Sequence, residues 1–276
     1  MKPTQTDPYP DPMPFVDPLE RHRRAADRAV AAGSADDIKQ LYVDLGADWW
    51  AAHAEDLDSI PVLSLPETQP VVLGELTGVY GRLLDAGCGP NPAVSVALAR
   101  TPNRTVVSLD IGWGAVRIAR EVGRREGVSL LGVVGDVEAL PFRAASFDGV
   151  ACDDTIEHLP DDAAGVAEIA RVAGVGAPVV LATPNRHCLT IIRSKAHDRA
   201  RGRRRPASAY FLSNSHLREY TWGEFERLIA PRFAVQARSA VGWEPRSWRR
   251  RLVNRAINVG PLRRVSQMIV VRAIRK

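Results

Sequence analysis

The sequence predicts an α/β protein in which a mostly parallel seven-stranded sheet carries helices on both faces and an N-terminal helical cap. Two observations predict this class. From Gly81 onward, short apolar or β-branched segments alternate with segments of helical periodicity, the pattern of strands connected by helices. The 276 residues are 45% hydrophobic, which suffices for a core without disulfide or metal support. Because no apolar run approaches the ~20 residues of a membrane span, an integral membrane protein is excluded.

Composition divides the chain into three parts. Residues 1–33 begin with a proline-rich stretch and are expected to form a flexible arm. Residues 34–79 are expected to form the helical cap, because Ser34 is a typical helix N-cap and a helical apolar face follows it. Residues 80–276 would then form the α/β domain. The apolar face of the cap consists of Ile38, Leu41, Tyr42 and Leu45.

Strands and helices are expected in a regular order within the α/β domain. Glycine, proline, asparagine or aspartate residues mark the ends of the expected strands and helices. The expected helices cover residues 93–100, 114–126, 162–173 and 221–230, the last opened by Thr221. The expected strands cover residues 82–87, 104–110, 129–136, 146–154, 176–185, 233–241 and 267–275.

Two basic insertions, at about 186–216 and 242–264, interrupt this order. Residues 193–205 contain seven lysines and arginines and one acid, and residues 246–276 contain ten and no acid, although the whole chain has a net charge of only +5. Ligands of open α/β sheets bind beyond the carboxyl ends of the strands, so we expect both insertions to cover the substrate. Their charge suits nucleic acid, phosphates or peripheral contact with a membrane, and a solvated basic face is the alternative.

The number and spacing of the cysteines indicate the cellular compartment in which the protein folds. Cys88, Cys152 and Cys188 are odd in number and widely spaced, which argues against a disulfide framework or an all-cysteine zinc site. The first residues lack the apolar core of a secretory signal. We therefore expect a cytoplasmic protein.

A glycine-rich turn follows the first expected strand, in the stretch LLDAGCGPN that begins at Leu83. Gly87 and Gly89 permit a tight bend, and the helix that follows offers free N–H groups to an anion. Asp110 ends the second strand, 25 residues after Asp85, where a carboxylate can accept both hydroxyls of a ribose. Asp136 follows the third strand, beside the place that an adenine would occupy. These positions predict a nucleotide-type cofactor.

Taken in order, these motifs resemble those of the class I S-adenosylmethionine (SAM) dependent methyltransferases, whose fold is Rossmann-like, over residues 80–240. The dehydrogenase fingerprint GxGxxG is absent, because the turn reads GCGPNP. The resemblance implies that Asp85, Gly87 and Gly89 surround the methionine part of SAM and that Asp110 holds its ribose. Ile111 would contact the adenine, Asp136 its amino group and Val137 its ring. The full predicted cofactor-binding set is Asp85, Gly87, Cys88, Gly89, Asp110, Ile111, Asp136, Val137 and Asp153.

A second cluster, Asp154-Thr155-Ile156-Glu157-His158, stands at the carboxyl end of the fourth expected strand. If it turns helically, Asp154, Glu157 and His158 share one face, which suits a divalent cation such as Mg²⁺ or Mn²⁺. The stretch is similar to the ExxEH motif of ubiquinone-pathway O-methyltransferases and of small-RNA 2′-O-methyltransferases, with Asp154 in place of the first glutamate. In the small-RNA enzymes a further metal-binding histidine precedes a helix, and His216 matches that position. Three interpretations stay open: a metal site, a general base at His158 supported by Glu157, and a structural cluster.

The leading hypothesis is a SAM-dependent O-methyltransferase that acts on a hydroxyl of a small molecule, a lipid-linked intermediate or a glycan. The alternative is an RNA 2′-O-methyltransferase, which the arginine-rich segments favour, although no recognisable RNA-binding module accompanies them. An alternative of another class is a non-catalytic SAM sensor or scaffold. The acid–histidine cluster argues against a sensor, because a sensor would not need it.

Overall fold

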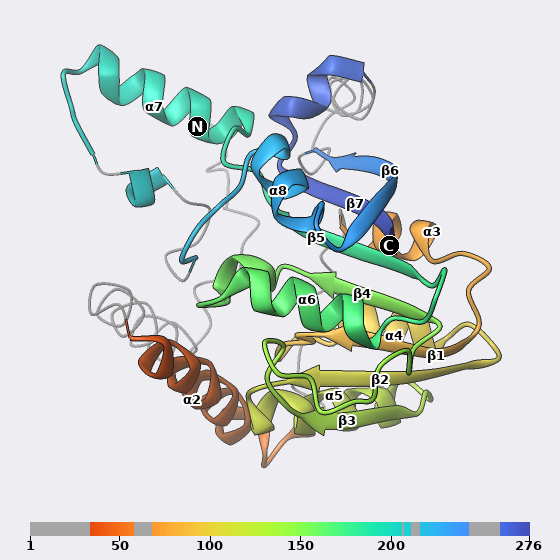
Figure 1. Cartoon of the computed structure of the whole chain (residues 1–276). Coiled ribbons are helices and arrows are strands. Elements are labelled where there is room, and N and C mark those ends of the chain that lie inside the picture. Colours follow the sequence, from red (N-terminus) through yellow and green to blue (C-terminus); the bar gives the residue numbers. More distant parts are fainter. Residues whose placement is uncertain (1–33, 58–67, 206, 211–215, 243–259) are drawn as a thin grey trace, which may run out of the picture.

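The computed structural model describes residues 34–57, 68–205, 207–210, 216–242 and 260–276 (Figure 1). The proline-rich arm expected at 1–33 lies outside the described residues. So does most of the second basic insertion, because residues 243–259 are not described. Among the helices that are described, none has the length and apolar character needed to cross a membrane.

A seven-stranded sheet forms the centre of the molecule, with strand order β3-β2-β1-β4-β5-β7-β6. Neighbouring strands are parallel from β3 to β5, and β7 runs antiparallel to both β5 and β6. The predicted α/β class is confirmed. The strands are β1 (Gly81–Ala86), β2 (Arg104–Asp110), β3 (Leu130–Val134), β4 (Gly149–Asp153), β5 (Pro178–Pro184), β6 (Phe233–Val241) and β7 (Met268–Arg275).

Helices cover both faces of the sheet, as Figure 1 shows. They are α2 (Ala35–His53), α3 (Gln69–Glu75), α4 (Ala93–Ala99), α5 (Trp113–Arg125), α6 (Asp162–Val172), α7 (Leu189–Ala200) and α8 (Trp222–Ile229), with 3₁₀ turns η2 (Ile156–His158), η3 (Ala207–Tyr210) and η4 (Gly260–Val265).

The hydrophobic core has two halves, one on each face of the sheet. On strand β1, Leu83 packs with α3, α4 and α5, whereas the next residue, Leu84, packs with α6 and α8. This alternation follows from the two-residue period of a strand. Both leucines are fully buried. A strand buried on both faces reads as a continuous apolar run, which is why β1, β4 and β5 could be recognised in the sequence.

Helix α2 begins where the sequence predicted the cap to begin. The Ser34 hydroxyl accepts a hydrogen bond from the Asp37 amide at 3.2 Å and thereby satisfies one free N–H of the first turn. The helix crosses the N-terminus of α5 at glycines: a Cβ atom on Gly114 would collide with the carbonyl oxygen of Gly46. Backbone contact at this crossing sets the position of α2 relative to the ends of the strands.

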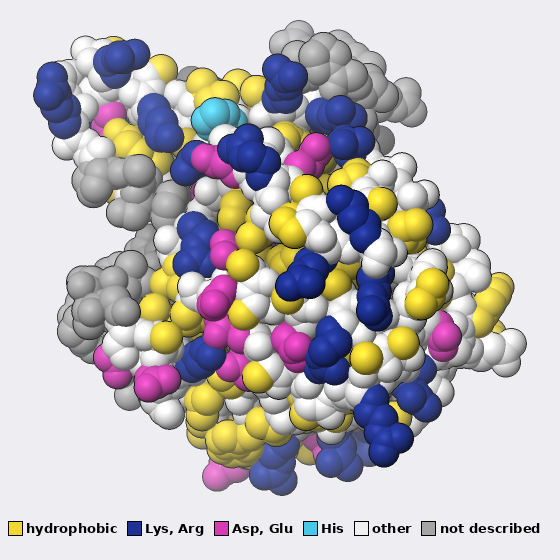
Figure 2. Space-filling model, viewed as in Figure 1, with side chains coloured by type: hydrophobic (Ala, Val, Ile, Leu, Met, Phe, Trp, Pro, Cys, Tyr) yellow, Lys and Arg dark blue, Asp and Glu magenta, His cyan; other side chains and the backbone are white. Residues whose placement is uncertain are grey.

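The first basic insertion contains a helix, α7, that the sequence analysis did not predict. It projects from the sheet in Figure 1, and Figure 2 shows Lys and Arg side chains gathered over it. Asp198 is buried at its inner side, where Arg205 pairs with it at 3.2 Å and the Tyr210 hydroxyl donates to it at 3.2 Å. Exposed arginines in and after the helix are Arg193, Arg199, Arg201, Arg203, Arg204 and Arg205.

Candidate active site

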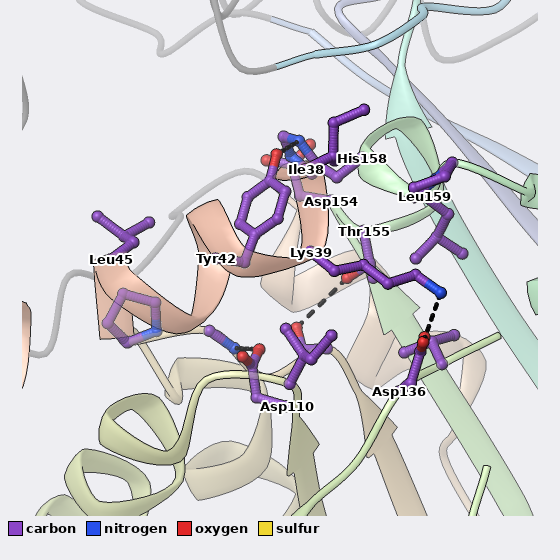
Figure 3. Close-up of a pocket in the computed structure, with 16 residues that line it drawn as sticks. Ile38, Lys39, Tyr42, Leu45, Asp110, Asp136, Asp154, Thr155, His158 and Leu159 are labelled. Carbon is purple, nitrogen blue, oxygen red and sulfur yellow. Dashed lines mark hydrogen bonds and ion pairs between the residues drawn. The ribbon is translucent and has the colours of Figure 1, made fainter. Parts of the chain in front are cut away.

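A cavity of about 350 Å³ lies beyond the carboxyl ends of β1, β2 and β4, beside helix α2 (Figure 3). This is the usual place for a ligand in an open α/β sheet. Helix α2 contributes Ile38, Lys39, Tyr42 and Leu45 to its lining, and the loops that follow the strands contribute Gly87, Gly89, Pro90, Asp110, Ile111, Asp136, Val137, Asp154, Thr155, His158, Leu159 and Pro160.

The glycine turn after β1 has the form that the sequence predicted. Gly87 and Gly89 have φ angles of 82° and 59°, in the left-handed region that favours glycine. A Cβ atom on Gly87 would also collide with the side chain of Thr155. Asp110 fixes the turn, because its Oδ2 accepts the N–H of Gly89 at 2.9 Å and its Oδ1 accepts the N–H of Gly112 at 2.8 Å.

Asp85 lies behind this turn and is not among the residues that line the cavity. Its side chain is buried, and Ser95 donates a hydrogen bond to its Oδ2 at 2.5 Å. Ser108 in turn donates to the Ser95 oxygen at 2.7 Å. Burial raises the pKa of Asp85 to about 6, although the Ser95 hydrogen bond acts in the opposite direction. Cys88 is also buried behind the lining, and burial raises the pKa of its thiol.

Lys39 links helix α2 to the loop after β3. Its Nζ lies 2.7 Å from Oδ2 of Asp136 and 2.6 Å from Oε2 of Glu138. Figure 3 shows Lys39 reaching along the cavity to Asp136. Burial lowers the pKa of Lys39, but the hydrogen bonds and charges of the two carboxylates outweigh burial and raise the pKa to about 12.

The cluster after β4 is not one continuous helical turn. Asp154 has a φ of 52°, and the 3₁₀ turn η2 begins two residues later, at Ile156. Glu157, His158 and His216 nevertheless come together: one potential ligand atom of each lies within 4.8 Å of the others. Asp154 lines the cavity beside this group and is not part of it. Its charge adds to burial, the larger cause, in raising the pKa of Glu157 well above its ordinary value.

The two imidazoles are held by hydrogen bonds from outside the group. The Tyr42 hydroxyl lies 2.6 Å from Nδ1 of His158, and Oε1 of Glu219 lies 2.8 Å from Nδ1 of His216. Nε2 of His158 faces Oε1 of Glu157 at 4.0 Å. Thr183 donates to the other oxygen of Glu157 at 2.8 Å.

Two buried carboxyl oxygens at the end of β4 accept no hydrogen bond within the described part of the chain. Oδ1 of Asp153 and Oδ1 of Asp154 are buried and accept no hydrogen bond from the described residues. Burial raises the pKa of Asp153 to about 8, and the charges of Asp154 and Asp85 add to the shift. Such a cluster suits a ligand that carries positive charge.

Sequence reasoning missed all four residues by which the cap lines the cavity. The apolar pattern places Ile38, Tyr42 and Leu45 on one face of their helix without a role in the site, and it gives no role to Lys39. The apolar spacing that predicted α2 gave a signal for Tyr42, but its partner His158 is 116 residues away. Nothing in the local pattern identifies such a pair.

Part of the chain is similar to a known protein family and to curated proteins. Residues 84–181 match the methyltransferase-domain family. The ubiquinone biosynthesis O-methyltransferase of Hahella chejuensis is 36% identical over 151 residues, which are 53% of this chain and 60% of that protein. The protein of the same name from Xanthomonas oryzae pv. oryzae is 32% identical over 147 residues, 52% of this chain and 59% of that protein. The matched residues are thus similar to methyltransferase domains, the family that the motifs of the sequence resemble. The match spans about three fifths of each curated relative.

Solved structures show the same fold as this chain. A protein from Pyrococcus horikoshii has a TM-score of 0.53 and 19% identity, covering 76% of this chain and 88% of its own. A SAM-dependent methyltransferase from Aquifex aeolicus has a TM-score of 0.52 and 14% identity, covering 75% of this chain and 89% of its own. At this level of identity the likeness shows the fold alone.

Proposed function

We propose that the chain is a SAM-dependent methyltransferase that methylates a hydroxyl oxygen of a small molecule. The observation that carries this proposal is the position of His158. It lines the same cavity as Gly87, Gly89, Asp110 and Asp136, to which the family resemblance gives cofactor-binding roles. The names of the curated relatives, ubiquinone biosynthesis O-methyltransferases, support an oxygen acceptor.

The residues present fit a bound SAM molecule. Its ammonium and sulfonium groups are cationic, and at the end of β4 Oδ1 of Asp153 and Oδ1 of Asp154 accept no hydrogen bond from the described residues, so both oxygens are available to a cationic ligand. The left-handed turn at Gly87 and Gly89 allows the backbone to approach the cofactor closely. In this proposal Asp110 holds the ribose, while Ile111 and Val137 contact the adenine.

When bound, SAM supplies a methyl group that the sulfonium has already activated, so the protein has to orient the acceptor and take up one proton. Orientation can contribute several kcal/mol, up to roughly 7–11 kcal/mol in favourable cases. His158 accepts the hydroxyl proton at Nε2, a role that typically contributes about 10²–10⁴-fold. Ile38, Leu45 and Leu159 form an apolar wall that excludes water from the reacting atoms.

The group Glu157, His158 and His216 is also a candidate site for a divalent cation, because two imidazoles and a carboxylate converge there. Such an ion would lower the pKa of an acceptor hydroxyl. Asp154, the fourth residue of the predicted set, would have to move toward the group to join it. The base and the cation interpretations share one requirement, an unprotonated Nε2 on His158.

The experiment is transfer of radiolabelled methyl groups from SAM into a fractionated cell extract, with and without a chelator. His158→Gln is the test variant, and His187→Gln is its control, because His187 is exposed and lines a different cavity. We expect label in the small-molecule fraction that is lost in His158→Gln and kept in His187→Gln. Label in nuclease-sensitive material would favour the RNA alternative, for which the exposed arginines of 193–205 are the support.

The same experiment also distinguishes the cation, general-base and sensor interpretations. Loss of transfer on chelation favours the cation site, and unchanged transfer favours His158 as a base. Binding of SAM without label in any fraction would favour a sensor over an enzyme. The cytoplasmic location expected from the sequence stays a prediction.

A further inference from the structure

We propose that Tyr42 of the cap helix is a positioning residue for His158. Its phenol oxygen accepts the Nδ1 proton of the imidazole, so that the Nε2 lone pair faces the site. This inference rests on the proposed function, in which Nε2 of His158 takes up a proton or binds a cation. Its structural basis is the distance of 2.6 Å between the Tyr42 oxygen and Nδ1 of His158.

The two side chains are also packed against each other. Their ring centroids are 5.3 Å apart in an edge arrangement, and Figure 3 shows Tyr42 extending from α2 toward His158. The hydrogen bond and the ring contact together limit rotation of the imidazole. Because His158 is the last residue of a short 3₁₀ turn, its own backbone element gives its ring little further support.

A neutral imidazole carries one proton, and the surroundings of its two nitrogens differ. On the Nε2 side, Oε1 of Glu157 lies at 4.0 Å, which is too far for a hydrogen bond. A proton on Nε2 would therefore find no acceptor in Glu157, whereas a proton on Nδ1 is donated to Tyr42.

His216 is held in the same way, on independent evidence. Its Nδ1 lies 2.8 Å from a carboxylate oxygen of Glu219, and the rings of His158 and His216 are 4.9 Å apart. A carboxylate accepts hydrogen bonds, so the proton of His216 is placed on Nδ1 and its Nε2 carries a lone pair. Histidines that bind metals or shuttle protons are typically oriented by a hydrogen bond to their other nitrogen. Tyr42 and Glu219 supply that bond to the two rings.

Tyr42 also makes the site depend on the cap. Helix α2 is positioned by its backbone contact with α5 at Gly46 and Gly114, and by the ion pair of Lys39 with Asp136. When α2 is in place, the orientation of His158 is set; when it moves away, the hydrogen bond is lost. The N-terminal cap is therefore part of the catalytic apparatus in this proposal.

The direct test is the tautomer of His158, measured by the ring ¹⁵N shifts of histidine-labelled protein near neutral pH. The His158 signals are assigned by their absence in His158→Gln. His53 is an internal reference, because its Nδ1 lies 2.8 Å from the carbonyl oxygen of Trp49, which can only accept. We expect His158 to give the same Nδ1–H pattern as His53. The Nε2–H pattern in the wild-type protein would overturn the proposal without any variant.

Tyr42→Phe provides the second test, because it keeps the ring contact and removes the hydroxyl. We expect the His158 signals to shift toward the Nε2–H or an averaged pattern while those of His53 stay unchanged. Gln40→Ala, which alters an exposed residue of the same helix, is the matched control and should leave both histidines as they are. An unchanged tautomer in Tyr42→Phe would contradict the proposal.

Kinetics separate this proposal from the proposed function. With an acceptor in hand, Tyr42→Phe should lower kcat by about five- to tenfold, as loss of one hydrogen bond implies, and leave the Kd for SAM unchanged. A parallel loss of SAM binding would indicate a structural role and count against positioning. If the wild-type protein transfers no methyl group to any acceptor, the proposed function fails, while the tautomer measurement still decides the role of Tyr42.

Discussion

Lys39 of the cap helix and Asp136 of the loop after β3 form an ion pair of 2.7 Å between Nζ and Oδ2 at the candidate cofactor cavity. Glu138 shares the same ammonium group at 2.6 Å. Asp136 is the residue to which the family resemblance gives the adenine amino group. An ion pair thus joins the cap to the loop after β3 in the structure without a ligand.

Removing this ion pair should loosen helix α2. Lys39→Met keeps the aliphatic stem and removes the charge. Because partly exposed ion pairs contribute at most about 1 kcal/mol, we expect amide hydrogen exchange in α2 to accelerate about fivefold or less. Exchange in α6 should not change. The difference should shrink in about 1 M salt, where charges are screened within ~3 Å, and Lys39→Arg should behave as the wild type. Equal exchange rates in Lys39→Met and wild type would show that the pair does not hold the helix.

The glycine crossing between α2 and α5 should be less tolerant than the ion pair. Gly114→Ala places a methyl group against the Gly46 carbonyl oxygen, so α2 must shift. We expect a loss of about 1–3 kcal/mol of unfolding free energy, faster proteolysis of α2 and weaker binding of SAM. Gly74→Ala in α3 is the control, because no atom lies within 4 Å of its added Cβ. If proteolysis of α2 were as slow in Gly114→Ala as in the wild type, α2 and α5 could move apart without destabilising the cap.

The sequence predicted the fold well because its signals are local. Strands such as β1 and β5 are buried on both faces and therefore read as apolar runs, and Ser34 and Thr221 cap their helices as expected. Helix α7 was not predicted, because its residues are mostly charged and lack an apolar period. The shared face of Asp154, Glu157 and His158 required a helical turn that includes Asp154, and the left-handed φ of Asp154 breaks that turn.

Local patterns predicted the site residues that directly follow a strand. The glycine turn, Asp110 and Asp136 each follow a recognisable strand, so the sheet brings them to one edge. Lys39 and Tyr42 reach the same cavity from a helix whose place depends on packing against α5. The closeness of His216 to His158 was expected only from the family resemblance, because it depends on how the chain after β5 returns to the site. Such long-range contacts leave no local period to detect.

The buried carboxyl of Asp85 should make stability depend on pH. Its pKa is raised to about 6 by burial, from an ordinary value of 3.8. Between about pH 4 and pH 6 the folded chain therefore holds a proton that the unfolded chain has lost. The contribution of this group to the free energy of unfolding should fall across this window by on the order of 3 kcal/mol and stay level above it. Asp153, whose pKa burial raises to about 8, should add a decline of its own that continues to higher pH.

Two variants should have opposite effects on this pH-dependent loss of unfolding free energy. Asp85→Asn should remove the part of the decline that Asp85 causes, because an amide does not titrate, and should leave the part that Asp153 causes. Ser95→Ala removes the hydrogen bond that lowers the pKa, so the decline should extend to higher pH. Denaturant unfolding at a series of pH values measures both effects. If Asp85→Asn kept the wild-type slope, another group would be responsible.

Asp110 should be essential for the shape of the cofactor site as well as for ribose binding. Both of its oxygens accept backbone N–H groups, from Gly89 and Gly112. In Asp110→Asn one oxygen is replaced by an NH₂ group, which would face an N–H donor. Hydrogen bonds to charged groups contribute about 1.5–3 kcal/mol each, so we expect a loss of that order in unfolding free energy and at least a tenfold rise in the Kd for SAM. Calorimetric titration with SAM and denaturant unfolding measure the two effects separately. Normal stability with weakened binding would assign Asp110 to the ribose alone, whereas lost stability with normal binding would assign it to the turns.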